Sequence, residues 1–182
     1  MFYTHTIRYG KYRMATPTNI IQYAEDESHI SWDTRYFHEL KSTVGYGAGV
    51  ETTKPLLHIA RQPKHDIKMK TYYLRATGFN FGQLPNVISG IVVKIKIDRG
   101  GRITDETVQL CLNETLIGEN RAVLSLEQKM LYGGEMDTWS IEGLTSSMLQ
   151  DSSFGITLRY KSHPSWPHRT SPTLHTVEIE IH

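Results

Sequence analysis

Histidine is the residue type in this chain that most readily suggests metal chemistry. The nine histidines of the 182-residue sequence are His5, His29, His38, His58, His65, His163, His168, His175 and His182. None of them forms the i, i+4 pair that two zinc ligands on one helix need, and the single cysteine cannot build a cysteine cluster. We therefore expect histidines that are exposed or hydrogen-bonded, no metal site and no cofactor.

Three other patterns contain residue types that are used in catalysis or ligand binding. The glycine-rich stretch GYGAGV at 45–50 lacks the Lys-Ser/Thr pair of a phosphate loop, and no helical pattern follows it. Glu25, Asp26 and Glu27 are adjacent, so they cannot face one another across a glycosidase cleft; calcium binding is their alternative. Cys111 has no base at a fixed spacing. The sequence therefore predicts a protein without enzymatic activity.

Composition narrows the class of partner. Hydrophobic residues make up 38% and charged residues 21% of the chain, which is typical of a folded protein. Residues 1–75 hold 11 Lys or Arg against 7 Asp or Glu, and residues 76–182 hold 9 against 12. This mild asymmetry is compatible with head-to-tail packing of copies, and it predicts no direct nucleic-acid binding. We expect no signal peptide and no membrane span.

Strands are the elements that must position any functional residue. Alternating apolar residues predict strands over 91–98, 106–112, 155–160 and 175–182, with one or two shorter ones within 115–126. Asn113–Glu114 is expected to form a turn, Thr145 to cap a single helical turn carrying Met148 and Leu149, and Cys111 to be a half-exposed strand residue. The fold class is therefore all-β, an antiparallel β-sandwich or jelly roll with an irregular N-terminal region.

The strand patterns also predict which side chains are buried. Those expected in one contiguous cluster are Val93, Ile95, Val108, Leu110, Ile156, Leu158, Ile179 and Ile181. Those expected to be exposed, or to face a partner, are Lys94, Lys96, Gln109, Glu178 and Glu180.

The alternation breaks at Gly78. The apolar residues within 72–76 are even-numbered, whereas Phe79 and Phe81 have the opposite parity, so one register cannot bury both sets. A β-bulge at Gly78 is the favoured interpretation, because an extra residue re-aims the side chains that follow. In the alternative, the strand ends at Thr77 and a new one begins at Phe79 and crosses to the other sheet.

The sequence predicts two regions with different kinds of structure. Residues 71–182 are expected to form the sandwich domain, and residues 1–70 an arm of loops that packs on the sandwich or on neighbouring subunits and depends on assembly for its order. The candidate interaction residues are the basic Arg61, Lys64, Lys68 and Lys70 and the loop aromatics Tyr132, Trp139 and Trp166. The aromatics could stack on sugars, anchor a protein interface or cover the ends of the core.

Several segments between Tyr72 and Tyr160 share an order and spacing with a known module. They are Pro85 with Ile88 to Val93, Asp105 to Leu110, Tyr132 to Trp139, and Ser152 to Ile156. In these segments the chain resembles a β-sandwich module that recurs in structural proteins of tailed bacteriophages. The resemblance does not extend to the first 70 residues.

The resemblance implies a non-enzymatic role in the virion, with assembly in the host cytoplasm. We expect foremost a capsid decoration or cement protein, which forms homo-oligomers and binds the major capsid protein, other virion proteins or its own copies. A neck, tail or baseplate component is the first alternative. A carbohydrate-binding module for host attachment, using Trp139 or Trp166, is the second.

Overall fold

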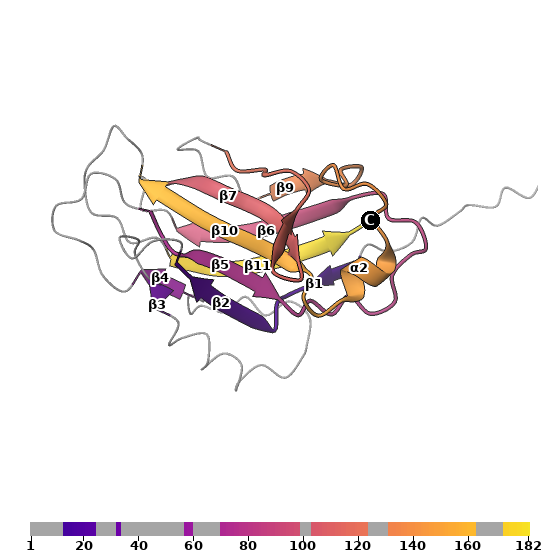
Figure 1. The fold of residues 1–182 in the computed structure, drawn as a ribbon, viewed down its shortest axis with the longest axis horizontal. Helices are drawn as coiled ribbons and strands as arrows, with labels where there is room; N and C mark the ends of the chain where they lie inside the picture. Colours follow the sequence, from indigo (N-terminus) through magenta and orange to yellow (C-terminus); the bar gives the residue numbers. More distant parts are fainter. Residues whose placement is uncertain are drawn as a thin grey trace, which may run out of the picture.

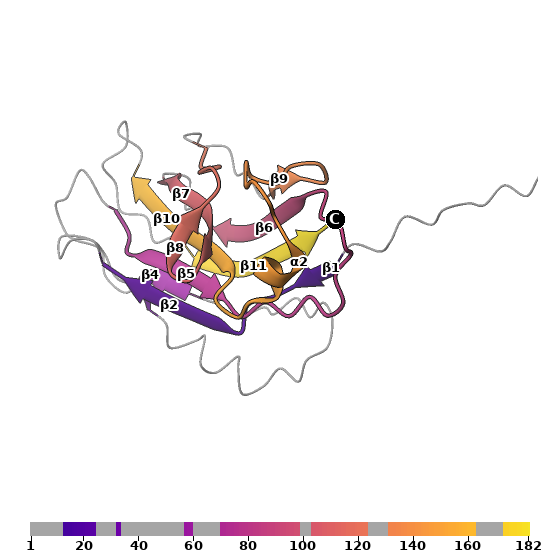
Figure 2. The ribbon, with the colours of Figure 1, turned by 45° about the vertical axis from the view of Figure 1, so that its right-hand side comes forward.

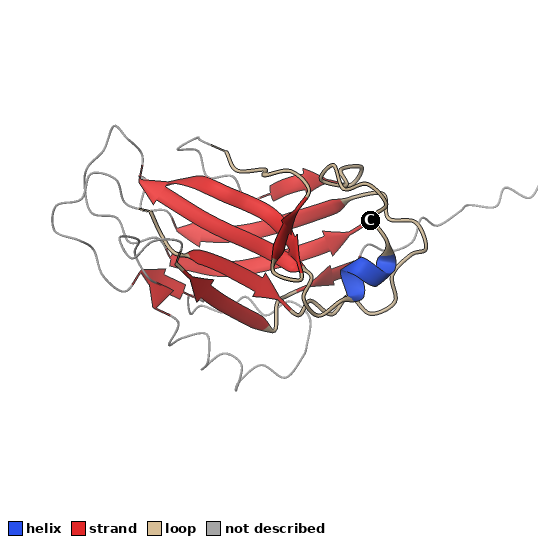
Figure 3. Cartoon of the chain, viewed as in Figure 1, coloured by secondary structure: helices blue, strands red, loops and turns tan. Residues whose placement is uncertain are grey.

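The computed structural model describes residues 13–24, 32–33, 57–59, 70–98, 103–123, 131–162 and 173–182. Strands dominate the described residues, with one short helix (Figure 3). The elements in chain order are β1 (Arg13–Ala15), β2 (Asn19–Tyr23), β3 (Trp32–Asp33), β4 (Leu57–Ile59), β5 (Tyr73–Thr77), β6 (Ile91–Asp98), β7 (Ile103–Leu112), β8 (Thr115–Ile117), β9 (Leu131–Gly134), α2 (Ser146–Gln150), β10 (Gly155–Ser162) and β11 (Thr173–Ile181).

The strands form two antiparallel sheets (Figures 1 and 2). Sheet A has the order β3-β4-β11-β6-β9, and β1 pairs with β11 on the same side as β4. Sheet B has the order β2-β5-β10-β7-β8. The predicted all-β sandwich is therefore confirmed, whereas jelly-roll connectivity remains a prediction.

The core lies between the two sheets. Along β6, Ile91, Val93, Ile95 and Ile97 point inward and are at most 1% exposed, as the period of two requires. Sheet B supplies Leu74, Val108, Leu110, Ile156 and Leu158 to the same cluster. All eight residues predicted to be buried together belong to this cluster, so that prediction is confirmed.

One of the five predicted exposures on the outer faces of the sheets is wrong. Lys96 is exposed, and Lys94 and Glu178 of sheet A and Gln109 of sheet B are half-buried, but Glu180 of sheet A is only 7% exposed. Its carboxylate forms an ion pair with the Lys94 ammonium, and its other oxygen lies 3.0 Å from Nε2 of His182. A strand carboxylate with a cationic partner on its own face tolerates burial, and the sequence period alone does not reveal that partner.

Four described strands that precede the predicted domain boundary at residue 71 belong to the two sheets. β1 pairs with the end of β11, and β2 pairs with the whole of β5. Ala15 and Ile20 enter the core, and β3 and β4 extend sheet A. These strands have two to five residues, which is too short for a recognisable alternation. Most of the predicted arm lies outside the described residues.

The chain leaves sheet B at Gly78 without a bulge. β5 ends at Thr77, Gly78 has φ +72°, and the next strand is β6 of sheet A. Phe79 and Phe81 stack with ring centres 6.0 Å apart and close one end of the core. The favoured bulge is therefore wrong. The alternative is right about the strand ending at Thr77, but a loop, not a new strand, follows to residue 90.

Two local predictions are confirmed. Asn113 and Glu114 both have positive φ, +48° and +64°, and form the two-residue turn of the β7–β8 hairpin, as a type I′ geometry requires. Thr145 is the N-cap of α2, since its Oγ1 accepts a hydrogen bond from the Met148 amide at 3.3 Å. Leu149 of this helix is buried in the core.

Cys111 is fully buried, so its predicted half-exposure is wrong. It faces the outer side of sheet B, which is also closed to solvent around Thr157 and Arg75. The β7–β8 hairpin bends over this face, because the Glu114 carbonyl accepts a hydrogen bond at 3.0 Å from Arg75, two strands away. Burial raises the pKa of the Cys111 thiol above 9.0, although Thr157 and Arg75 act in the opposite direction.

Gly78 and Gly82 form a matched pair for testing this loop. Both have positive φ, but a Cβ at Gly78 would lie 2.2 Å from Oγ1 of Thr18, whereas one at Gly82 has no neighbour within 4 Å. Gly82→Ala should lower the free energy of unfolding by about 1–2 kcal/mol, through the left-handed backbone alone. Gly78→Ala should cost about 2–5 kcal/mol, because overpacking adds to that term. Urea unfolding of both variants tests this, and equal costs would contradict it.

Burial should make Cys111 unreactive in the folded protein. Because its pKa is raised, the neutral thiol is favoured on folding; this contribution to stability is present below pH 9 and is lost as the pH rises above it. A thiol reagent at about pH 8 should react much faster in denaturant than under native conditions. Equal rates in both would show that the outer face of sheet B is open.

Candidate interaction surface

Three of the described loops gather at one end of the sandwich, here called the loop end. In sheet B, Gly155 pairs with both Thr77 and Cys111; in sheet A, Ile91 pairs with both Gly134 and Ile181. The strand ends are thus in register, and loops 78–90, 113–114 and 135–154 leave from the same side. The last residue, His182, lies there too (Figure 1).

Tyr132 and Trp139 are the buried supports of this end. Both are 0% exposed. The Tyr132 hydroxyl donates a hydrogen bond to the buried Asp105 carboxylate at 2.8 Å, and the Trp139 indole N–H donates to the Ile91 carbonyl at 3.0 Å. Of the three roles expected for the loop aromatics, the structure places these two rings as cover for the end of the core, where each polar group has an internal partner.

The indole of Trp139 determines the shape of the turn after β9. Gly133 has φ +77°, and a Cβ there would lie 2.4 Å from the indole nitrogen, so only glycine allows this approach. Asp137 Oδ1 accepts hydrogen bonds from the Trp139 amide at 2.7 Å and from Arg121 at 2.8 Å. The turn between Gly134 and Trp139 is therefore fixed at both its ends.

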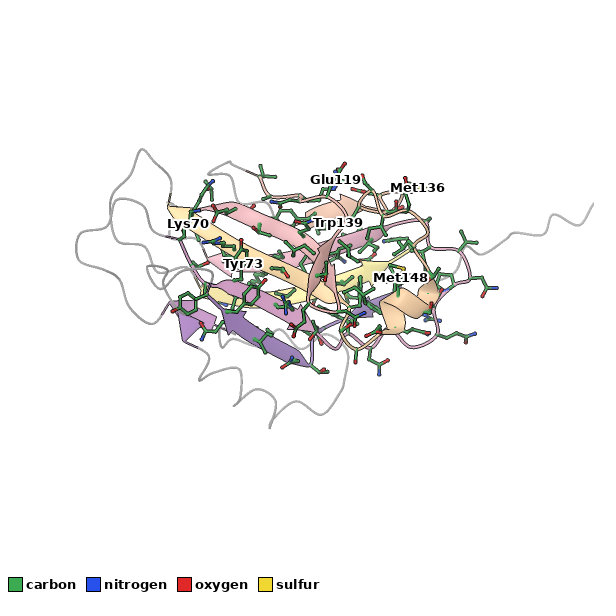
Figure 4. All side chains as sticks on the ribbon, in the orientation of Figure 1. Lys70, Tyr73, Glu119, Met136, Trp139 and Met148 are labelled. Carbon is green, nitrogen blue, oxygen red and sulfur yellow. The ribbon has the colours of Figure 1, made fainter. Side chains whose placement is uncertain are left out.

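Two apolar side chains project from this rigid frame. Met136 is 85% exposed at the tip of the turn, and Val87 is 79% exposed in loop 78–90 (Figure 4 shows Met136). The two segments are joined, because the Ile91 amide donates to the Asp137 carbonyl at 2.9 Å. Loop 78–90 is also held by α2 through the Ser146 hydroxyl and the Pro85 carbonyl at 2.6 Å. Exposed apolar groups on a preorganised frame are suited to contact with another protein.

Exposed carboxylates are also found at this end of the sandwich. Glu114, Glu135, Glu142 and Asp151 are exposed in the same loops. Hydrogen bonds from the backbone N–H and the hydroxyl of Ser153 lower the pKa of Asp151 below its usual 3.8, so this group is ionised at neutral pH. The loop end thus presents both exposed apolar groups and carboxylates, and this composition favours a basic partner.

The predicted basic residues are placed only in part. Arg61, Lys64, Lys68 and Trp166 lie outside the described residues. Lys70 is described, and its ammonium lies 2.9 Å from Glu106, whose other oxygen lies 3.1 Å from Nε of Arg159. Lys70 therefore has an internal partner. Reversing its charge would disturb sheet B as well as any external contact.

Sequence reasoning missed a cation–aromatic cluster on the outer face of sheet B. The rings of Tyr23 and Tyr73 stack at 5.1 Å, and the guanidinium groups of Arg75 and Arg159 lie 4.6 and 4.4 Å from them. Arg159 also donates to the Tyr73 hydroxyl at 2.8 Å. The outward alternation of Tyr73 and Arg75 in β5 was the available signal. This cluster joins β2 to the sheet and holds its arginines in internal contacts.

Two features of the described part of the chain concern metal binding and membrane crossing. There, no three His, Cys, Asp or Glu side chains are placed to share a metal ion. The same residues contain no helix of the length and apolar character that a membrane crossing requires.

Substitutions at Trp139 and Met136 should distinguish a residue that stabilises the fold from one that is displayed on the surface. Trp139→Ala removes a fully buried indole, so the free energy of unfolding should fall by about 3–5 kcal/mol. Met136→Ser changes an exposed group and should alter it by less than about 0.5 kcal/mol. Chemical denaturation of the two variants measures both values. A comparable loss for Met136→Ser would mean that Met136 is part of the fold and is not displayed for binding.

No protein-family model, no curated protein and no solved structure matches this chain.

Proposed function

We propose that this protein is a non-enzymatic structural protein of a bacteriophage virion, foremost a capsid decoration or cement protein. It is assembled in the host cytoplasm and binds the major capsid protein, other virion proteins or its own copies. The observation that carries the proposal is the loop end, where Val87 and Met136 are displayed on a frame fixed by Trp139 and Asp137. Such preorganisation lowers the entropic cost of docking.

The segments that carry the phage resemblance support the proposal through what they build. Ile88 to Val93 lead into and form the start of β6, and Asp105 to Leu110 form the middle of β7. Tyr132 to Trp139 form β9 and the turn that displays Met136, and Ser152 to Ile156 lead into β10. The shared motifs are thus residues of framework and turn, as expected for an assembly module without catalytic groups.

The glycan alternative loses one of its two candidate residues. Stacking on a pyranose needs an exposed ring, and the indole of Trp139 is buried. Sugar binding would then depend on Trp166, outside the described residues. A neck, tail or baseplate position uses the same kind of surface, and the two locations are distinguished by how particles fail without the protein.

The proposal predicts incorporation into particles through the loop end. Virions purified on a density gradient should contain the chain at a fixed ratio to the major capsid protein, measured by quantitative mass spectrometry. The pair Val87→Ser and Met136→Ser should reduce incorporation at least about tenfold, as expected for losing the centre of an interface. Ile21→Ser is the matched control, since Ile21 is also apolar and 41% exposed but lies on β2.

The same particles distinguish the possible locations. Loss of a cement protein should leave complete particles that burst at lower temperature or under milder osmotic shock, because many bridging contacts act together. Loss of a neck or tail component should stop completion or infection. Absence of the chain from purified virions would overturn the proposal.

A further inference from the structure

We draw no further inference here: the strongest candidate, the outer face of sheet A, where Met14 of β1 and Leu131 of β9 are exposed, carries none, because nothing in the structure shows what covers it.

Discussion

One shared apolar layer between the two sheets is the constraint on which the other features depend. The inward side chains of β6 and β11 meet those of β7 and β10, and a fully buried Ile or Leu contributes about 1.5–3 kcal/mol. The loop end is rigid for the same reason, because Phe79, Trp139 and Leu149 of its loops are anchored in this layer. The exposed residues are therefore displayed by segments whose next neighbours are part of the core.

Polar groups on the outer faces have to be satisfied in a different way. On sheet B, Arg75 and Arg159 are less than a tenth exposed, and they are accommodated by tyrosine rings, Glu106 and the carbonyl of Glu114. Buried charge pairs add little net stability, but removing one partner is costly. Here these contacts favour one alignment of β2 on β5, since the Tyr23 ring meets Tyr73 and Arg75 in that register.

The long strands and two short turns could be predicted from the sequence because their signals are local. The alternation of β6 and β11, the Asn113–Glu114 turn and the Thr145 cap each depend on residues within one segment. The burial of Cys111, Glu180 and Trp139 could not be predicted, because their partners come from distant segments: the curled hairpin, Lys94 and Ile91. β1 and β2 were not predicted, because strands of 3 and 5 residues are too short to show a period of two. The bulge at Gly78 was predicted wrongly, because the parity of apolar residues does not distinguish a bulge from the end of a strand.

The position of β11 in the chain has a consequence for the order of events during synthesis. This strand is the centre of sheet A, with β6 on one side and β1 and β4 on the other, yet it is the last element in chain order. Ribosomes add about 5–20 residues per second, and sheets built from distant segments form slowly. Until residue 181 has emerged, β6 has an unpaired edge and the apolar layer lacks Val177, Ile179 and Ile181. The nascent chain therefore carries an adhesive edge from the completion of β6 until β11 has emerged, and protection of that edge by a chaperone would raise the yield of folded protein.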